Sequence, residues 1–238
     1  MKVMILNNSG NVGKSFLARE LFYFNMQDIC DDVALIEIET HNSASSKFGI
    51  DTIKISGKEL NTLYKQLLIN DCVVVDVGAS NIIALFEELA KNDVNNIIDE
   101  IDYFVVPVTN KSKIQDDTLK ILLALIELRV PKEKIKVVFN AVDNIKQMNA
   151  FIQKASKIVD IDENLVIPEY QYLNEIEKMG VTTHQLANSE KDYKALAKEA
   201  YRSGDIEKGD KYADLSLMKG SAKKITEKLK EIFEYLKK

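Results

Sequence analysis

The sequence predicts an α/β fold with a mainly parallel, twisted sheet flanked by helices, followed by a helical C-terminal appendage. Three observations support this prediction. Short apolar runs alternate with segments of helical periodicity, which is typical of a parallel sheet covered on both faces. A glycine-bearing loop that ends in lysine follows the first apolar run directly. After Pro168 the pattern becomes wholly helical.

Six apolar runs are expected to form the strands. They are Val3 to Leu6, Val33 to Ile38, Cys72 to Val77, Tyr103 to Val108, Ile135 to Phe139 and Leu165 to Ile167. Open α/β sheets place their sites at the carboxyl ends of the strands. The site is therefore expected where polar residues end these runs, namely at Asn7, Asn8, Glu37, Glu39, Asp76, Thr109, Asn110 and Asn140.

The helices between the strands are expected at Phe16 to Met26, Ile82 to Ala90, Ile114 to Leu128 and Ile145 to Ile158. Breaks in the helical tail are expected near residues 203–205 and 220–221, where glycine stands beside serine. We expect residues 1–188 to form the binding domain and residues 189–238 to form a helical extension packed on that same domain.

The composition favours one cytosolic α/β domain. The chain has 238 residues and a net charge of −5, and it contains no signal-peptide pattern and no run of the roughly 18 apolar residues that span a membrane. Cys30 and Cys72 are far apart and lack metal-ligand spacing, so free thiols are expected in preference to a disulfide or a zinc site. The tail after Ser189 is relatively basic, which permits contact with an anionic polymer or a membrane without requiring it.

The loop after the first apolar run has the residue types of a phosphate-binding loop. Gly10 and Gly13 are expected to let the backbone curl with its N–H groups inward, while the helix that follows adds its positive dipole end. Lys14 would contact the β and γ phosphates, and Ser15 would ligand the bridging Mg²⁺. The candidate nucleotide contacts in this segment are Ser9, Gly10, Asn11, Val12, Gly13, Lys14, Ser15 and Phe16.

The loop resembles the deviant Walker A loop, K-G-G-x-G-K-[ST], of the ParA/MinD family of P-loop NTPases. Ser9 stands in place of the first lysine and Asn11 in place of the second glycine, and the whole string is most similar to that of StbB-type plasmid stability proteins, a divergent ParA-like branch. Asparagine tolerates the left-handed conformation best after glycine. In the family, the first lysine reaches the phosphates of the partner subunit's nucleotide in an ATP-bound dimer, and serine cannot carry that charge.

The same resemblance implies a Walker B strand and a catalytic acid. The run that ends at Asp76 would hold Mg²⁺ through water, and Gly78 would bring the backbone near the γ-phosphate. Glu37 and Glu39 stand where the family has D-x-D, so Glu37 would lie nearer the metal and Glu39 would position the attacking water. Two solvated acids at a strand end remain the alternative. His41, in the segment that follows, is interpreted as a surface residue.

An adenine site is implied near the end of the sheet. Asn140 stands where the family places an asparagine that contacts the base edge, and an amide supplies the donor and acceptor that such an edge requires. A simple turn-capping role for Asn140 remains open. Pro168 lies in a segment similar to the I-P-x-x loop that packs beside the adenine in these proteins.

The resemblance implies a slow, Mg²⁺-dependent ATPase that uses ATP and ADP states to switch a homodimer or a partner-bound form. Plasmid segregation or positioning would be its role, with a DNA-binding adaptor protein as partner and possible weak, non-specific DNA binding. Lys111 and Lys113 are candidate replacements for the charge missing at Ser9. The alternatives are a nucleotide-binding scaffold with little turnover and a small-molecule kinase or ligase of the dethiobiotin synthetase type.

Overall fold

The computed structural model of the chain describes residues 1–39, 45–91 and 95–237 and divides into two compact units, Met1–Glu169 and Tyr170–Lys238. The first unit contains a seven-stranded sheet in the order β3-β2-β4-β1-β5-β6-β7, and every pair of neighbouring strands is parallel. The strands are β1 (Lys2–Ile5), β2 (Ala34–Ile38), β3 (Ile53–Ile55), β4 (Val73–Val77), β5 (Tyr103–Val108), β6 (Ile135–Asn140) and β7 (Val166–Ile167). The predicted parallel sheet is confirmed.

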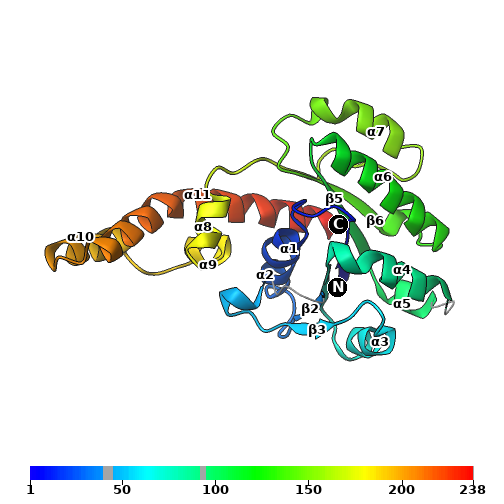
Figure 1. Cartoon of the computed structure of the whole chain (residues 1–238), viewed down its shortest axis with the longest axis horizontal. Helices are drawn as coiled ribbons and strands as arrows, with labels where there is room; N and C mark the ends of the chain where they lie inside the picture. The colour runs from blue at the N-terminus through cyan, green and yellow to red at the C-terminus, as the bar shows by residue number, and fades with distance from the viewer. Residues whose placement is uncertain (40–44, 92–94, 238) are drawn as a thin grey trace. The chain divides into compact units, whose positions relative to one another are not determined.

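Helices cover both faces of this sheet (Figure 1). One face carries a continuous helical run made of α1 (Lys14–Phe16), the π-helical η1 (Leu17–Tyr23) and α2 (Phe24–Met26). The opposite face carries α3 (Leu60–Ile69), α4 (Ile82–Lys91), α5 (Asn95–Glu100), α6 (Ser112–Glu127) and α7 (Asn149–Ala155). Right-handed crossovers explain this division, because connections that move in opposite directions along a sheet lie on opposite faces.

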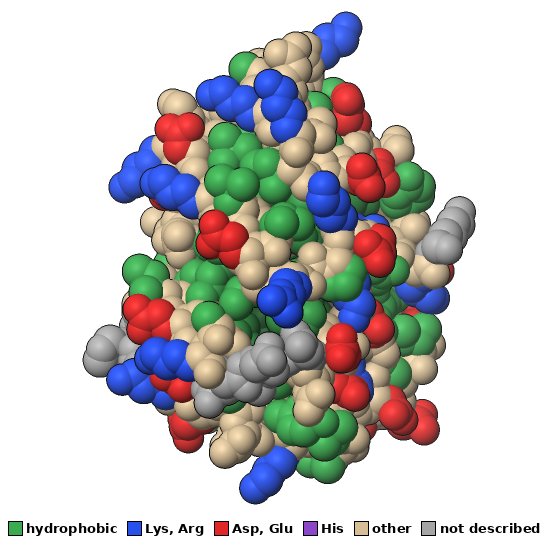
Figure 2. All heavy atoms as spheres, turned by 90° about the vertical axis from the view of Figure 1, so that its right-hand side faces the viewer, with side chains coloured by type: hydrophobic (Ala, Val, Ile, Leu, Met, Phe, Trp, Pro, Cys, Tyr) green, Lys and Arg blue, Asp and Glu red, His purple; other side chains and the backbone are tan. Residues whose placement is uncertain are grey.

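Short 3₁₀ helices complete the first unit. They are η2 (Ser46–Phe48), η3 (Ala79–Asn81), η4 (Lys132–Lys134) and η5 (Ile145–Met148). Figure 2 shows the side of this unit that carries α4 to α7, where acidic and basic side chains are interspersed with hydrophobic ones. That view therefore shows no surface dominated by one sign of charge.

Strand β1 lies at the centre of the sheet, between β4 and β5. Val3, Met4, Ile5 and Leu6 have no solvent exposure, as expected for a strand covered on both faces. Met4 and Leu6 belong to the cluster that packs against the helices of the α3 to α7 face. The candidate phosphate loop, residues 7–13, thus begins at a fully buried strand end.

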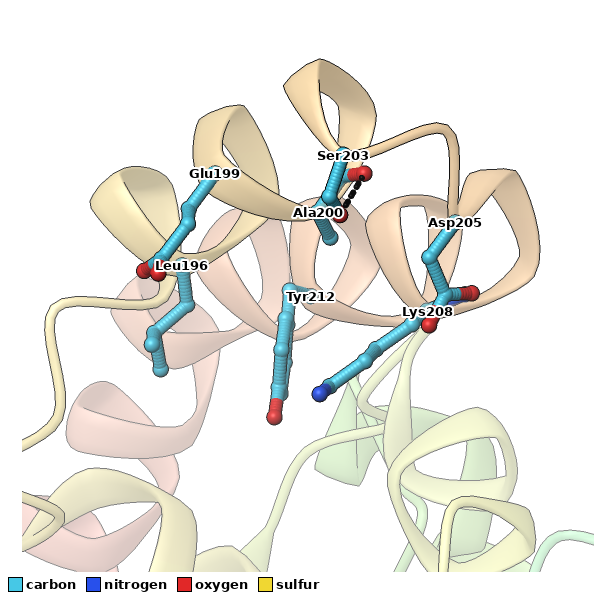
Figure 3. Close-up of a pocket in the computed structure, with 7 residues that line it drawn as sticks. All are labelled: Leu196, Glu199, Ala200, Ser203, Asp205, Lys208 and Tyr212. Carbon is cyan, nitrogen blue, oxygen red and sulfur yellow. Dashed lines mark hydrogen bonds between the residues drawn. The ribbon is translucent and has the colours of Figure 1, made fainter.

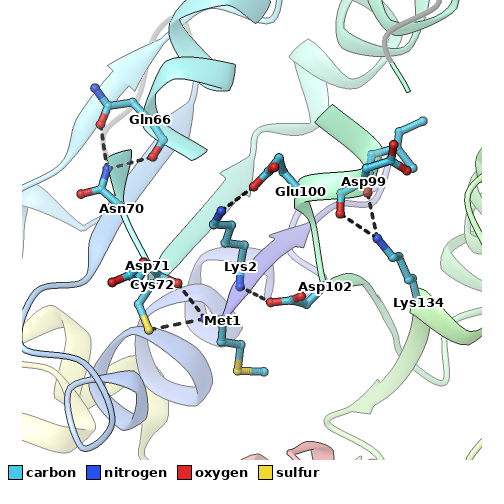
Figure 4. Close-up of polar contacts among 11 residues, drawn as sticks. Met1, Lys2, Gln66, Asn70, Asp71, Cys72, Asp99, Glu100, Asp102 and Lys134 are labelled. Atoms are coloured by element: carbon cyan, nitrogen blue, oxygen red, sulfur yellow. Dashed lines mark hydrogen bonds and ion pairs between the residues drawn. The ribbon is translucent and has the colours of Figure 1, made fainter. Parts of the chain in front are cut away.

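Polar contacts fix the opposite, amino-terminal end of β1 (Figure 4). The amine of Met1 donates to the carbonyl oxygen of Asp71 at 2.7 Å, just before β4. The backbone N–H of Lys2 donates to Asp102 at 2.7 Å, just before β5, and its ammonium pairs with Glu100 at 2.6 Å. These contacts hold β1 in register with both neighbours, so the carboxyl ends of the three strands are aligned.

Cys30 and Cys72 form a disulfide, so the expectation of free thiols is wrong. Cys30 follows α2 and Cys72 precedes β4, and their Cα atoms are 6.3 Å apart although the two residues are 42 positions apart in the sequence. The backbone N–H of Ala34 donates to the carbonyl oxygen of Cys72, which shows how the pairing of β2 with β4 brings the two segments together. The large separation of the two cysteines along the sequence gave no indication that they would be close in space.

The second unit is helical. It contains α8 (Leu173–Lys178), α9 (Thr183–Ala187), α10 (Tyr193–Arg202) and α11 (Ile206–Leu236), with a small core that includes Ile176, Leu186, Tyr193, Leu215 and Met218. The unit begins at Tyr170, earlier than the division expected at residue 188, because α8 and α9 pack against α11. Among the described residues, no helix is both long enough and apolar enough to cross a membrane.

The expected break at residues 203–205 is confirmed, whereas the one at residues 220–221 is wrong. Gly204 adopts a φ of 81° and Asp205 caps the next helix by accepting a hydrogen bond from the N–H of Lys208. Helix α11 continues through Gly220 because Met218 and Ala222 on either side are buried in the core of the unit. Burial on both sides outweighs the roughly 1 kcal/mol that a glycine costs inside a helix.

Candidate functional site

The candidate phosphate loop turns at two left-handed residues. Asn11 has a φ of 55° and Gly13 a φ of 93°, and helix α1 starts immediately afterwards at Lys14. Asn11 therefore adopts the conformation for which asparagine is suited. Gly10 has no positive φ, and nothing lies within 4 Å of where its Cβ would stand.

The ammonium of Lys14 lies inside the loop. Its Nζ donates to the carbonyl oxygen of Ser9 at 2.8 Å, and the residue is only 8% exposed. Burial lowers the pKa of Lys14, while the negative charges of Asp76 and Glu39 act to raise it. The lysine is thus held at the loop with two carboxylates near enough to affect its charge.

Asp76 is the residue before the last in β4 and is 6% exposed. Burial raises its pKa to about 6, against the opposing effects of a hydrogen bond from Ser15 and the charge of Lys14. Its Oδ1 is buried and has no hydrogen-bond partner. A buried carboxylate oxygen that lacks a partner is costly unless another group completes it.

The donor set around Asp76 suits Mg²⁺, which prefers hard oxygen ligands and retains several waters. Ser15 and Asp76 supply a hydroxyl and a carboxylate that already contact each other. Among the described residues, no group of three or more His, Cys, Asp or Glu side chains forms a ready-made ion site. An ion here would depend on phosphate oxygens and water for its remaining ligands.

Glu37 is buried in β2 and accepts a hydrogen bond from the backbone N–H of Ser45 at 2.9 Å. Its charge acts to raise the pKa of Asp76, so the two carboxylates lie near each other. Residues 40–44, which include His41, lie outside the described residues. The sequence-based role of Glu37 near the metal stays a prediction, and the structure adds a contact with the segment after residue 44.

Glu39 lies directly against Gly78. A Cβ at Gly78 would overlap the Glu39 carboxylate and would stand 3.1 Å from the carbonyl oxygen of Ile38. The backbone N–H of Gly78 donates to that same Ile38 oxygen at 2.9 Å, and the hydroxyl of Ser80 donates to Glu39 at 3.3 Å. A side chain at position 78 would therefore force the Glu39 carboxylate to move.

Asn140 ends β6 and reaches the phosphate loop. Its Nδ2 donates to the carbonyl oxygen of Val12 at 3.0 Å, and a Cβ on Gly13 would overlap its amide. Pro168 follows β7 directly, and the next residue, Glu169, donates from its N–H to Asp143 at 2.9 Å. The structure thus brings Asn140 to the loop, while contacts of Asn140 and Pro168 with adenine remain predictions.

Helix α6 contributes two residues that the sequence analysis did not identify. Asp117 accepts a hydrogen bond from the hydroxyl of Ser9 at 2.9 Å, and Thr118 accepts one from Asn7 at 2.8 Å. Both contacts join residues more than 100 positions apart in the sequence. Local pattern contains no signal for them, since polar residues on a helix are usually exposed to solvent. Lys111 and Lys113 lie exposed at the start of the same helix.

Arg19 is another residue of the site that the sequence analysis did not identify. It is 1% exposed, its Nε donates to Glu20 at 3.0 Å, and its guanidinium lies 4.3 Å from the centroid of the Phe48 ring. Its positive charge lowers the pKa of Asp76. The helix that follows the loop therefore supplies a second, buried cation to the acidic site.

A cavity of about 290 Å³ lies in the second unit, where α10 turns into α11 (Figure 3). The hydroxyl of Ser203 donates to the carbonyl oxygen of Ala200 at 2.9 Å, and Asp205 accepts from the N–H of Lys208 at 3.1 Å. These polar groups are used by the helix ends themselves. The cavity therefore offers no arrangement comparable to the phosphate loop.

Comparison with known proteins gives a match at the level of fold. No protein-family model and no curated protein matches the chain. MinD from Pyrococcus horikoshii OT3, solved with Mg-ADP, is 13% identical with a TM-score of 0.54, covering 89% of this chain and 93% of that one. A ParA family ATPase from Chlorobium tepidum is 12% identical with a TM-score of 0.51, covering 91% and 98%.

A third solved structure extends this comparison. It is a candidate plasmid partition protein from Borrelia burgdorferi B31 bound to AMPPNP, 16% identical with a TM-score of 0.50, covering 91% of this chain and 98% of that one. The chain shares with these proteins a seven-stranded parallel sheet, its flanking helices and a C-terminal helix. The chain therefore has the fold of the MinD/ParA-type P-loop NTPases.

Proposed function

We propose that the chain is a Mg²⁺-dependent ATPase of the ParA/MinD type that acts as a nucleotide-controlled switch for dimerisation or partner binding. The observation that carries this proposal is the buried Asp76 carboxylate beside Ser15 and Lys14, with its Oδ1 unpartnered. Such a carboxylate is expensive to maintain in a fold that needs only stability. A metal ion bound with a nucleotide phosphate would supply the partner that this carboxylate lacks.

In this proposal the loop residues and Lys14 bind the phosphates. Ser15 and Asp76, with Glu37 close by, would hold Mg²⁺, which neutralises charge on the β and γ phosphates. Glu39 orients the attacking water, and Gly78 allows its carboxylate to reach the backbone that faces the γ-phosphate. Asn140 and Pro168 bind the adenine of ATP or ADP.

The partner part of the proposal is a nucleotide-dependent homodimer in the cytoplasm that recruits a small DNA-binding adaptor, with at most weak, non-specific DNA binding of its own. Plasmid segregation or positioning is the biological role. It is supported by the resemblance of the loop to StbB-type proteins. Turnover should be slow, because Ser9 supplies no positive charge to a partner's nucleotide and Lys111 or Lys113 would have to replace it.

One observation favours a second candidate function, a nucleotide-binding scaffold with little turnover. The hydroxyl of Ser9 is bonded to Asp117 within the same chain, so residue 9 faces a carboxylate where the family has a lysine. A site with this arrangement could bind ATP and assemble without hydrolysing it efficiently.

Sedimentation with parallel measurement of phosphate release tests the two candidates. The protein is compared without nucleotide, with ADP, with ATP and with a slowly hydrolysed ATP analogue. A dimer confined to the ATP states, with slow release that disappears in Lys14→Ala, is the expected result. Assembly with ATP, together with phosphate release no faster than in Lys14→Ala, would favour the scaffold. Absence of any nucleotide binding would refute both candidates.

A further inference from the structure

A continuous set of polar contacts connects the phosphate-binding lysine to the surface of helix α6. The Nζ of Lys14 donates to the carbonyl oxygen of Ser9 at 2.8 Å, and the hydroxyl of Ser9 donates to Asp117 at 2.9 Å. The other carboxylate oxygen of Asp117 accepts from the ammonium of Lys120 at 2.9 Å. Each group in this series is held by the next.

We propose that Asp117 is a positioning residue of the nucleotide site, which orients Ser9 so that its carbonyl oxygen aims the Lys14 ammonium at the phosphates. The inference rests on the proposed function. An ammonium has three donors, so one hydrogen bond to Ser9 leaves two for phosphate oxygens. Fixing the direction of the first bond fixes the directions available to the other two.

The geometry around Ser9 supports this role. Its N–H donates to the Asn7 side chain at 2.8 Å, its hydroxyl donates to Asp117, and its carbonyl oxygen accepts from Lys14. With backbone and side chain engaged at once, Ser9 is held in one conformation. The Asn7 side chain is itself held by Thr118, next to Asp117, so two adjacent residues of α6 hold the start of the loop.

The state of Asp117 fits the same role. Hydrogen bonds from Lys120 and Ser9 lower the pKa of Asp117, so the side chain is an ionised acceptor near neutral pH. Lys120 is 69% exposed, and an ion pair of that kind contributes little to stability. Asp117 is only 17% exposed, and its contact with Ser9 is the one directed toward the site.

A double-mutant cycle tests the inference, using Ser9→Ala, Asp117→Ala and the double variant in the full chain. The readouts are the dissociation constant for Mg-ATP, KM and kcat for phosphate release, and the thermal unfolding midpoint without nucleotide. One lost positioning hydrogen bond should weaken ATP binding about five-fold in either single variant. The double variant should be no weaker than the singles, because both remove the same contact.

Two further variants separate positioning from charge and from folding. Asp117→Asn keeps an acceptor oxygen and should restore ATP binding to within about two-fold of the unmodified protein. Asp116→Ala removes a neighbouring, exposed carboxylate on the same helix and should leave ATP binding unchanged. Asp117→Asn and Ser9→Ala are mild substitutions, so the test stands even where Asp117→Ala fails to fold.

The outcomes are distinguishable. Additive losses in the double variant, or ATP binding that Asp117 variants leave unchanged, would overturn the inference while the proposed function stands. A lowered unfolding midpoint with unaltered ATP binding would show that Asp117 is merely structural and would also overturn it. Failure of the unmodified protein to bind ATP would overturn the proposed function and the inference together.

Discussion

The side-chain amide of Asn140 donates from Nδ2 to the carbonyl oxygen of Val12, so the end of β6 holds the candidate phosphate loop, which lies 128 residues earlier in the chain. This contact leaves no space for a side chain on Gly13, because a Cβ there would overlap the amide. The conformation of the loop and the position of the Asn140 side chain are therefore coupled, so a change in one should alter the other.

Gly13→Ala should destabilise the nucleotide-free protein, since it combines a positive φ of 93° with an overlap against Asn140. We expect a loss of about 2 kcal/mol or more in the free energy of unfolding, measured by urea titration. Gly10→Ala is the matched control, because Gly10 has no positive φ and open space at its Cβ. Its unfolding free energy should change by less than about 0.5 kcal/mol, and equal losses in both variants would contradict the argument.

Asp76→Asn should stabilise the nucleotide-free protein at neutral pH. Burial raises the pKa of Asp76 from 3.8 to about 6, so the folded state retains a proton that the unfolded state has released between these pH values. Stability therefore falls as the pH rises through this window, by about 3 kcal/mol in total. An amide does not ionise, so in Asp76→Asn the free energy of unfolding should not fall in this way as the pH rises.

The measurement is thermal unfolding of both proteins at pH 3.5 and pH 7.5, without nucleotide or metal. The variant should gain stability over the unmodified protein at pH 7.5 and show little gain at pH 3.5. In a second series with Mg-ATP, the variant should lack the stabilisation that the nucleotide gives the unmodified protein. A difference that is the same at both pH values would show that the Asp76 charge is not the cause.

Gly78→Ala should reduce turnover while leaving nucleotide affinity nearly unchanged. An added Cβ would displace the Glu39 carboxylate, which is proposed to orient the attacking water. Loss of such a group typically costs about 100-fold or more in rate. Single-turnover phosphate release should fall to a similar level in Gly78→Ala and Glu39→Gln, with ADP affinity within about two-fold. Normal turnover in Gly78→Ala would remove Glu39 from this role.

Reduction of the disulfide should lower stability substantially. Cys30 and Cys72 close a loop of 42 residues, and loss of such a cross-link costs about 4 kcal/mol when the unfolded chain regains its freedom. Urea unfolding with and without dithiothreitol measures the change. Cys30→Ser should match the reduced protein and be insensitive to the reductant; identical midpoints under all conditions would show that the bond does not stabilise the fold.

The sequence predicts those parts of the site that lie on consecutive residues. The apolar run of β1, the loop up to Ser15 and the strand that contains Asp76 each have a local pattern, and the structure places all three together. Strand β3 (Ile53–Ile55) was missed because Lys54 interrupts its short apolar run. Helix α3 was omitted although Leu60, Leu63 and Leu67 have helical spacing and are buried.

The rest of the site depends on contacts between distant segments. The bond of Asp117 to Ser9 and that of Asn140 to Val12 exist only because the sheet brings their elements together. The same is true of the disulfide. A sequence pattern describes what each segment does alone. It therefore does not reveal contacts between distant segments, and it does not reveal that Arg19 is buried.

The central place of β1 also bears on how the chain folds as it is synthesised. Strand β1 is synthesised before both of its neighbours, because β4 and β5 begin only at residues 73 and 103. Until then a wholly apolar run lacks the hydrogen-bonding partners that will cover it, which is a recognised hazard for aggregation. Both edges of β1 can be paired only after β5, which begins at residue 103, has been made, and Asn140 can contact the loop only after β6 has been made.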